Sequence, residues 1–287
     1  MRIGSNEHKV LFCGSFLSTH LEYDPQTLEW PELSELHLTR LRSIPFWRTA
    51  LAVEQNAGAM VSAFATLVED PLIRRTVALQ GEEESRHARL VEKIIDHYAI
   101  PVQKPPPPKP RITRQAFVDF GYEECLDAFF GFGLFGLARE LQFFSPALLD
   151  VIQPLLVEET RHIVFFTNWI AYERARSGRG TAPMVAALTG IGYLRALART
   201  VATVYGGRKD GTGFVAGGAT EMVEGLTLRR FLSSCAEENE RFMTQIDPRL
   251  LRPQLVPRIA AFIGRFVPRD SGASRAPRSL RSDAETG

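Results

Sequence analysis

The sequence predicts an all-α protein that is built on a four-helix bundle, with additional helices after the bundle. Apolar residues recur with the 3.6-residue period of amphipathic helices from Pro45 onward, and no set of alternating strands joined by hairpin turns is found. Proline and glycine divide this pattern into two long helical hairpins, and one motif of glutamate and histidine occurs once in each hairpin. We therefore expect two related helix pairs that pack around one core.

The first predicted hairpin spans residues 44–98. Its first helix covers residues 44–68, and its second covers residues 71–98 after the break at Glu69-Asp70-Pro71. Proline suits the first turn of a helix because the N–H group that it lacks would have no intrahelical partner there. The following segment, residues 101–110, reads PVQKPPPPKP and is expected to be a stiff, polyproline-like spacer between the hairpins.

The second predicted hairpin consists of helices over residues 113–143 and 146–172, with Ser145-Pro146 as the break. Glycines and prolines then delimit three further predicted helices, over residues 183–204, 218–246 and 254–266. The first 43 residues show no clear period and are expected to form loop and short helix. The predicted division is an N-terminal extension (1–43), a four-helix bundle (44–177), accessory helices (178–267) and a flexible tail rich in Ser, Arg and Pro (268–287).

The composition excludes several classes of protein. With 45% apolar residues among 287, disorder cannot be the dominant state, and the 34 basic and 33 acidic residues leave a net charge of only +1. This balance argues against nucleic acid as a partner. The longest strongly apolar stretch, Cys125 to Ala138, has 14 residues and contains Asp127, whereas a bilayer requires about 20. We expect no membrane span.

The N-terminus and the cysteines favour a cytoplasmic protein. The first residues, MRIGSNEHKVLFCGSF, lack the basic start, extended apolar core and small-residue cleavage site of a secretory signal. Cys13, Cys125 and Cys235 are odd in number, far apart and without CxxC spacing. Neither a disulfide framework nor a zinc-thiolate site is indicated.

The informative feature is a duplication. Glu83-Glu84-Ser85-Arg86-His87 recurs as Glu158-Glu159-Thr160-Arg161-His162, at an offset of 75 residues, and the same offset separates Pro71 from Pro146. The second glutamate of each motif, Glu84 or Glu159, thus lies 13 residues after the proline that opens its helix. Equal depth in two helices is what two related hairpins would produce, so the repeat concerns architecture as well as motif.

The spacing within each motif suits metal binding. A glutamate and a histidine three residues later, as in Glu84 with His87 and Glu159 with His162, project from the same helix face and can reach a common point in a bundle core. Carboxylates neutralise divalent cations, and imidazoles suit iron. Di-iron and di-manganese bundles combine two such helices with one glutamate from each of two other helices. Two more carboxylates are therefore expected.

Glu54 is the predicted carboxylate of the first helix. It lies among apolar and small residues, 17 positions before Pro71, while Glu84 lies 13 positions after that proline. Two antiparallel helices joined near residue 70 would hold the two glutamates at similar depth, since each residue rises 1.5 Å along a helix.

The carboxylate of the third helix is less clearly marked. The 75-residue offset from Glu54 leads to Phe129, which cannot bind a metal, so the duplication is imperfect here. We favour Glu124, with Asp127 and Glu123 as alternatives. Glu140 is less favoured because it lies six residues before Pro146, about 9 Å from the end of the helix.

With this ligand pattern, residues 45–175 resemble the ferritin-like di-iron carboxylate superfamily, which includes rubrerythrins, ribonucleotide reductase small subunits, bacterial multicomponent monooxygenases and arylamine N-oxygenases. In that superfamily each half pairs a helix carrying one glutamate with a helix carrying Glu-x-x-His. The resemblance implies that Glu83 and Glu158, each just before a motif glutamate, accept hydrogen bonds from the ligating imidazoles and orient them across the site.

The resemblance further implies an enzyme, a non-haem di-iron oxidoreductase that uses O2 as co-substrate to oxidise a small organic substrate. Hydroxylation, N-oxygenation, desaturation and oxidative cleavage stay open, as do manganese or mixed iron and manganese in the same ligands. An external electron donor and a homodimer are also left open. The residues beyond the bundle favour a substrate pocket, and Gly131, Gly133 and Gly136 among phenylalanines are compatible either with a plain core or with an apolar cavity.

Two other functions compete with this interpretation. The first is a ferroxidase or a peroxide-reducing bundle that handles metal without an organic substrate. The second is a non-enzymatic helical interaction protein, in which both motifs lie on solvated helix faces and Arg86 and Arg161 pair with neighbouring glutamates.

Overall fold

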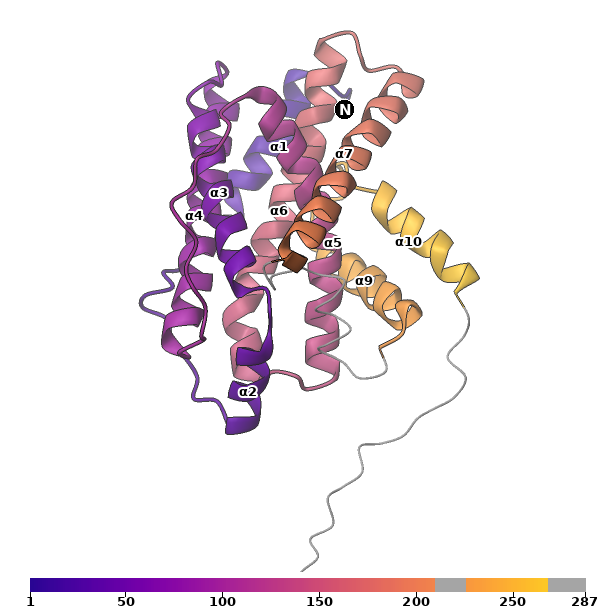
Figure 1. The fold of residues 1–287 in the computed structure, drawn as a ribbon. Helices are drawn as coiled ribbons and strands as arrows, with labels where there is room; N and C mark the ends of the chain where they lie inside the picture. Colours follow the sequence, from indigo (N-terminus) through magenta and orange to yellow (C-terminus); the bar gives the residue numbers. More distant parts are fainter. Residues whose placement is uncertain (210–225, 268–287) are drawn as a thin grey trace, which may run out of the picture.

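The structure is a computed structural model that describes residues 1–209 and 226–267, and within these ranges it contains helices and no strand (Figure 1). Four long helices form the bundle, with α3 packed on α4 and α5, and α6 packed on α4 and α5. The predicted all-α bundle with extra helices is confirmed. The bundle helices are α3 (Trp47–Ala65), α4 (Pro71–His97), α5 (Arg114–Glu140) and α6 (Pro146–Arg176).

The helices α4 and α6 begin in the same way. The Asp70 side chain accepts hydrogen bonds from the backbone N–H groups at the start of α4, and the Ser145 side chain accepts one from the first turn of α6. Pro71 and Pro146 occupy the first helical position in each case. Because capping and proline fix both starting points, equal counts from each proline lead to equal depths in the bundle.

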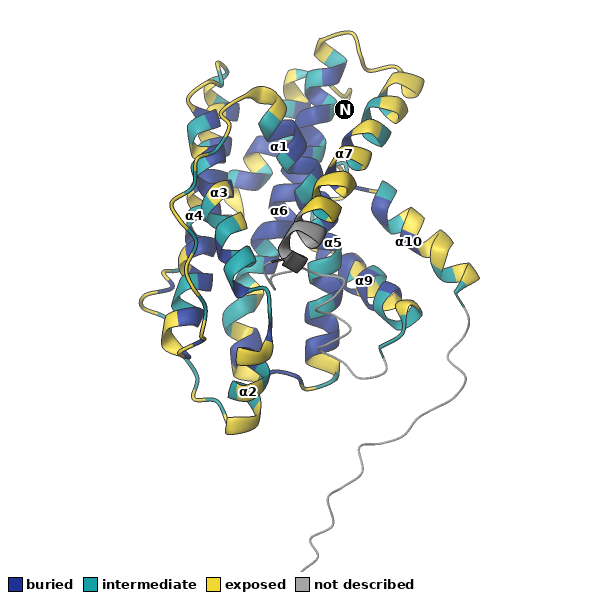
Figure 2. Ribbon diagram, viewed as in Figure 1, coloured by how far each residue is buried: buried dark blue, intermediate teal, exposed yellow. Residues whose placement is uncertain are grey.

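Five further helices surround the bundle. Two precede it, α1 (Asn6–Ser18) and α2 (Glu35–Ser43), and three follow it, α7 (Ala182–Lys209), α9 (Leu228–Met243) and α10 (Leu255–Phe266). The helix α1 packs on α4 and α6, whereas α7 and α9 pack on α5, and α10 packs on α9 (Figure 1). Buried residues concentrate where these helices face one another (Figure 2). None of the helices in the described ranges combines the length and apolarity that crossing a membrane requires.

The remaining sequence predictions differ from the structure at the C-terminal side. The predicted helix over residues 218–246 corresponds to α9, which begins at Leu228, while residues 218–225 lie outside the described residues. The predicted tail, residues 268–287, also lies outside them. In the N-terminal 43 residues the expected loop and short helix are found, and the aromatic rings of Phe12 and Phe16 on α1 belong to the core.

Two of the three glycines in the phenylalanine-rich part of α5 serve helix packing. A Cβ atom on Gly133 would lie 2.9 Å from the Cα of Cys235 on α9, and Gly136 faces the same helix. These two glycines let α9 approach α5 closely and leave no cavity. Gly131 differs, because a Cβ atom there would meet nothing within 4 Å.

A second close approach joins α3 to α4 beside the motif. A Cβ on Gly58 would lie 2.9 Å from the backbone nitrogen of Ser85, and a Cβ on Gly81 would lie 2.7 Å from that of Ser62. Small residues therefore let the two helix backbones approach closely at Gly81 and at Ser85, on either side of Glu84 along α4.

We expect Gly81→Val to lower the free energy of unfolding by about 1–3 kcal/mol, since overpacking of a tight contact forces the backbones apart. Urea denaturation followed by circular dichroism measures this change. The matched control is Gly14→Val on α1, where a Cβ atom has open space. An equal loss of stability in both variants would contradict close packing of α3 on α4.

Candidate metal centre

The two duplicated motifs meet in the middle of the bundle. Glu84, His87, Glu159 and His162 each offer a ligand atom, and these atoms lie within 4.8 Å of one another. All four residues are buried, and the two histidines are 0% exposed. Arg86 and Arg161 of the same motifs are buried as well, so the expectation of solvated ion pairs on exposed helix faces is wrong. Such a concentration of charge in a core is unfavourable unless each group finds a partner.

The inner atoms of this cluster follow a crossed pattern. The Nδ1 atom of His87 lies 3.0 Å from Oε1 of Glu159 and 3.7 Å from Oε2 of Glu84. The Nδ1 atom of His162 lies 3.0 Å from Oε1 of Glu84 and 3.8 Å from Oε2 of Glu159. Each of these two carboxylates thus directs one oxygen toward each imidazole, which is the arrangement of a carboxylate that spans two positions.

Both inner nitrogens lack a hydrogen-bond partner. Nδ1 of His87, Nδ1 of His162 and Oε2 of Glu84 are buried atoms for which the described part of the chain supplies no hydrogen bond. Leaving such atoms unpaired costs about 1–3 kcal/mol each. A cation bound between the imidazoles and the carboxylates would satisfy all three atoms, so the residues present fit a metal site.

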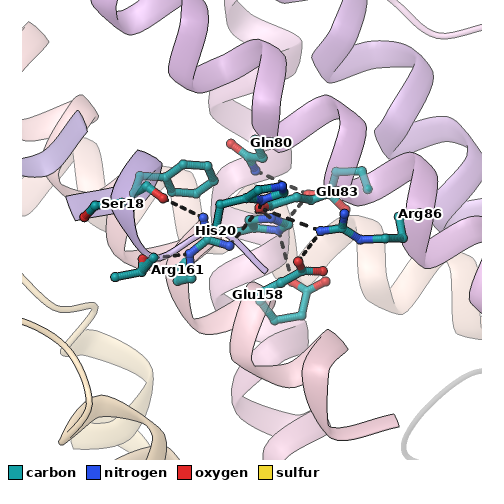
Figure 3. A network of polar contacts seen from close by, with 12 residues as sticks. Ser18, His20, Gln80, Glu83, Arg86, Glu158 and Arg161 are labelled. Carbon is teal, nitrogen blue, oxygen red and sulfur yellow. Dashed lines mark hydrogen bonds and ion pairs between the residues drawn. The ribbon is translucent and has the colours of Figure 1, made fainter. Parts of the chain in front are cut away.

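The outer nitrogens of both imidazoles are fully engaged. His87 Nε2 lies 2.9 Å from Oε2 of Glu158, and His162 Nε2 lies 2.9 Å from Oε2 of Glu83, so each carboxylate contacts the histidine of the other hairpin. Figure 3 shows this network together with its two arginines. Glu158 accepts a hydrogen bond from Arg86, and Glu83 accepts one from Arg161 at 2.8 Å.

These contacts keep the Glu83 carboxylate ionised. Burial alone would raise the pKa of Glu83, but the hydrogen bond and charge of His162 and the charge of Arg161 lower the pKa to about 2. Each outer carboxylate is balanced by one buried arginine. An ionised acceptor at Nε2 holds a proton on that nitrogen, so Nδ1 is the nitrogen through which each imidazole would bind a metal.

His20 and Tyr23 complete the outer network, although sequence reasoning gave them no role. The segment after α1 places Nδ1 of His20 at 2.6 Å from Oε1 of Glu83, and the hydroxyl of Tyr23 donates to Glu158 at 3.0 Å. The Tyr23 ring also lies 4.5 Å from the guanidinium carbon of Arg86. Because the first 43 residues have no periodic pattern, no sequence signal placed them beside the motifs.

Glu54 reaches the cluster from α3. Its Oε2 atom lies 3.6 Å from Nδ1 of His87. Burial raises the pKa of Glu54 to about 7, and the negative charges of Glu159 and Glu84 add to this effect, although contact with His87 opposes it. A carboxylate of this kind is ionised at neutral pH when a cation lies beside it.

Among the candidates on α5, Glu124 lies beside the inner cluster. Burial raises its pKa well above the ordinary value, and the charges of Glu159 and Glu84 and a hydrogen bond with Glu159 act in the same direction. Glu123 instead pairs with Arg199 on α7 at 2.7 Å. Glu140 is the last residue of α5, is exposed, and pairs with Arg230 at 2.7 Å, so the structure places it away from the cluster.

Asp127, the remaining α5 candidate, lies one helical turn after Glu124. Its Oδ1 atom is buried without a hydrogen-bond partner in the described ranges, and burial, with the charge of Glu123 next, raises its pKa to about 7. It borders the cavity described below.

Within the described residues, histidines are the basic groups that contact the inner carboxylates. No lysine or arginine of the described ranges forms an ion pair with any of them, and their ion-pair contacts are to histidine alone. Two divalent cations would match the negative charge that a group of four carboxylates can carry. The four residues are Glu54, Glu84, Glu124 and Glu159.

A cavity of about 500 Å³ borders this carboxylate group. It lies between α3, α5 and α6, with Arg199 and Thr200 of α7 on one side, and Gly131 is part of its wall. Its lining includes Glu54, Glu124 and Glu159 together with apolar side chains, among them Val53, Phe120, Leu155 and Leu156. A larger cavity, of about 620 Å³, lies at α1 and α6 and touches Arg161, but none of the inner carboxylates lines it.

Comparison with known protein families, with curated proteins and with solved structures found no match for this chain. Its function must therefore be argued from the site itself.

Proposed function

We propose that this chain is a ferritin-like, non-haem di-iron oxidoreductase that uses O2 to oxidise a small organic substrate. The observation that carries the proposal is the pair of buried imidazoles, His87 and His162, whose Nδ1 atoms have no hydrogen-bond partner in the described residues and face carboxylates that no lysine or arginine of those residues pairs with. Each hairpin supplies one Glu-x-x-His helix and one helix with a further glutamate, which is the ligand composition of di-iron and di-manganese bundles.

The residues divide naturally between two cations. His87 and Glu54, which lie 3.6 Å apart, would hold one cation, and we assign His162 and Glu124, the α5 carboxylate beside Glu159, to the other. Glu84 and Glu159 belong to both, since each faces both imidazoles. Iron bound there would supply the electrons for O2 reduction, and the same ligands accept manganese.

The chain itself orients the ligands and limits access of water. Glu83 and Glu158 hold the protons on the outer nitrogens of the imidazoles, and Arg86 and Arg161 hold those carboxylates in turn. Gln80 donates a hydrogen bond to Oε1 of Glu84 at 3.3 Å. The bundle core surrounds the cluster on the α4 side, so the cavity beside α3 and α5 is the approach for a substrate.

That cavity favours an organic substrate over iron or peroxide alone. Beside its carboxylates the wall includes Val53, Phe120, Leu155 and Leu156, apolar side chains that suit the body of an organic molecule and that a hydrated ion does not need. A volume of about 500 Å³ lies within the usual range for small-molecule sites.

Anaerobic reconstitution with Fe(II) is expected to give about two irons per chain, followed by a transient visible absorption band when air is admitted. Metal analysis and stopped-flow optical spectroscopy measure the two effects, and protein loaded with Zn(II) is the colourless control. Absence of bound metal would favour a helical interaction protein. Iron that is oxidised in repeated turnovers, with no organic compound consumed in a screen, would favour a ferroxidase or a peroxide-reducing bundle.

A further inference from the structure

Some of the charged residues in the wall of the cavity beside the carboxylates are paired with one another, and others are not. Arg199 lies in its wall and pairs with both Asp119, in a contact of 2.6 Å, and Glu123, in a contact of 2.7 Å, while Arg195 pairs with Asp119 at 3.2 Å. Two arginines thus meet two carboxylates on this side. This group is neutral as a whole and offers no net charge to a ligand.

Arg48 is the exception among the cations that line the cavity. No ion pair or hydrogen bond joins it to any residue of the described ranges, and its Nε atom is buried without a partner. A half-buried guanidinium with an unsatisfied donor calls for an anionic acceptor. Of the acids in the same wall, Glu123 is paired with Arg199 and does not contact Arg48.

The distance between Arg48 and the carboxylates determines how long such a ligand must be. Arg48 precedes Glu54 by six residues on α3, about 9 Å along the helix axis. Gly131 follows Glu124 by seven residues on α5, and because α3 and α5 run in opposite directions, Gly131 lies on the same side of the carboxylates as Arg48 (Figure 1). The open space at Gly131 therefore lies at about the depth of Arg48 along the bundle, on the side of the cavity away from the carboxylates.

We propose that this cavity binds small organic acids, with the carboxylate on Arg48 and an apolar body that extends past Gly131 toward Glu54, Glu124 and Glu159. This inference rests on the proposed function, which makes the site catalytic, and it adds the class of substrate. A monocarboxylate matches Arg48, the cation that the described part of the cavity wall leaves unpaired. A phosphate would carry more negative charge into a wall that is already rich in carboxylates.

The test is isothermal titration of the metal-loaded, anaerobic protein with 3-phenylpropanoate and with its neutral analogue 3-phenylpropanamide. We expect the acid to bind more tightly than the amide, and Arg48→Gln to weaken binding of the acid by about tenfold to a hundredfold, as for other charge-assisted hydrogen bonds. Arg48→Lys should restore part of the affinity. The control is Arg75→Gln, which removes an exposed arginine outside the cavity.

A second variant tests the location independently of charge. Gly131→Leu would fill the cavity without a clash, since a Cβ there meets nothing within 4 Å, and it should abolish binding of the acid. Gly14→Leu, at the equally open position on α1, should not change binding. Equal affinity for the amide and the acid, or no effect of Arg48→Gln, overturns the inference, and so does unchanged binding in Gly131→Leu.

Metal analysis of the same samples separates the two proposals. Binding of the acid that depends on Arg48 in a chain that holds no metal would overturn the di-iron function and support the anion site. A chain that holds two metals and does not bind the acid would overturn the anion site alone.

Discussion

Alanine at Glu84 or at His162 is expected to abolish stoichiometric metal binding while the far-UV circular dichroism stays helical. Glu84 directs one oxygen to each imidazole, so its loss removes a ligand from both metal positions at once. His162 contributes the only imidazole of its half of the site. Metal content after anaerobic Fe(II) loading should fall from about two ions per chain toward zero.

The fold should survive these changes because the cluster is unfavourable without a cation. Removing a buried carboxylate from a group of like charges relieves repulsion, which offsets part of the lost packing. The matched control is Glu140→Ala, which removes an exposed glutamate that pairs with Arg230 and should keep full metal content. Full metal occupancy in Glu84→Ala or in His162→Ala would sink the ligand assignment.

The same measurement decides between the carboxylates of α5. We expect Glu124→Ala to lose metal and Asp127→Ala to retain it, because Glu124 contacts Glu159 while Asp127 lies a turn further along. If Asp127→Ala alone lost metal, the third-helix ligand would need correction.

Much of the fold follows from local sequence chemistry. The bounds of α4 and α6 depend on Asp70-Pro71 and Ser145-Pro146, whose capping and backbone restriction act within four residues. Such short-range effects can be inferred without tertiary information. The repeated spacing from these starting points then indicates that Glu84 and Glu159 share one depth, provided that the helices are adjacent.

The crossed contacts and the N-terminal segment required the structure. His20 is 63 residues from Glu83, and Tyr23 is 135 residues from Glu158, in a segment without helical period. Periodicity reports which face of a helix is apolar and cannot indicate which distant loop covers a buried ion pair. The arginines illustrate the same limit, since i,i+3 spacing suggested local pairing for Arg86, whereas its closer carboxylate is Glu158 on the other hairpin.

The cavity also depends on tertiary packing. The three glycines in the phenylalanine-rich part of α5 looked equivalent in the sequence. In the structure, Gly133 and Gly136 lie against α9, whereas Gly131 borders open space. Arg48 gained significance only when the structure showed that its neighbours in space leave it unpaired. The roles of these glycines and of Arg48 depend on which helix lies opposite them, and the sequence of a single helix does not show this.

Replacing Arg161 by methionine should lower the free energy of unfolding by about 3–5 kcal/mol, because the buried Glu83 carboxylate then loses its arginine partner. Arg161 is 5% exposed and donates to Glu83, to the Phe16 carbonyl and to the Thr19 hydroxyl. The control is Lys104→Met at an exposed pair with Glu92, where the loss should stay within about 1 kcal/mol. Urea denaturation of both variants measures the difference.

The double variant Arg161→Met with Glu83→Leu separates charge burial from orientation of the imidazole. Because it removes both members of the pair, it should recover a large part of the stability that the single variant loses. It also removes the acceptor at Nε2 of His162, so metal affinity should still fall by about tenfold to a hundredfold. Recovery of stability without recovery of metal affinity is the result that assigns Glu83 to positioning of the ligand. If metal affinity were unchanged, Glu83 would serve only to balance the charge of Arg161.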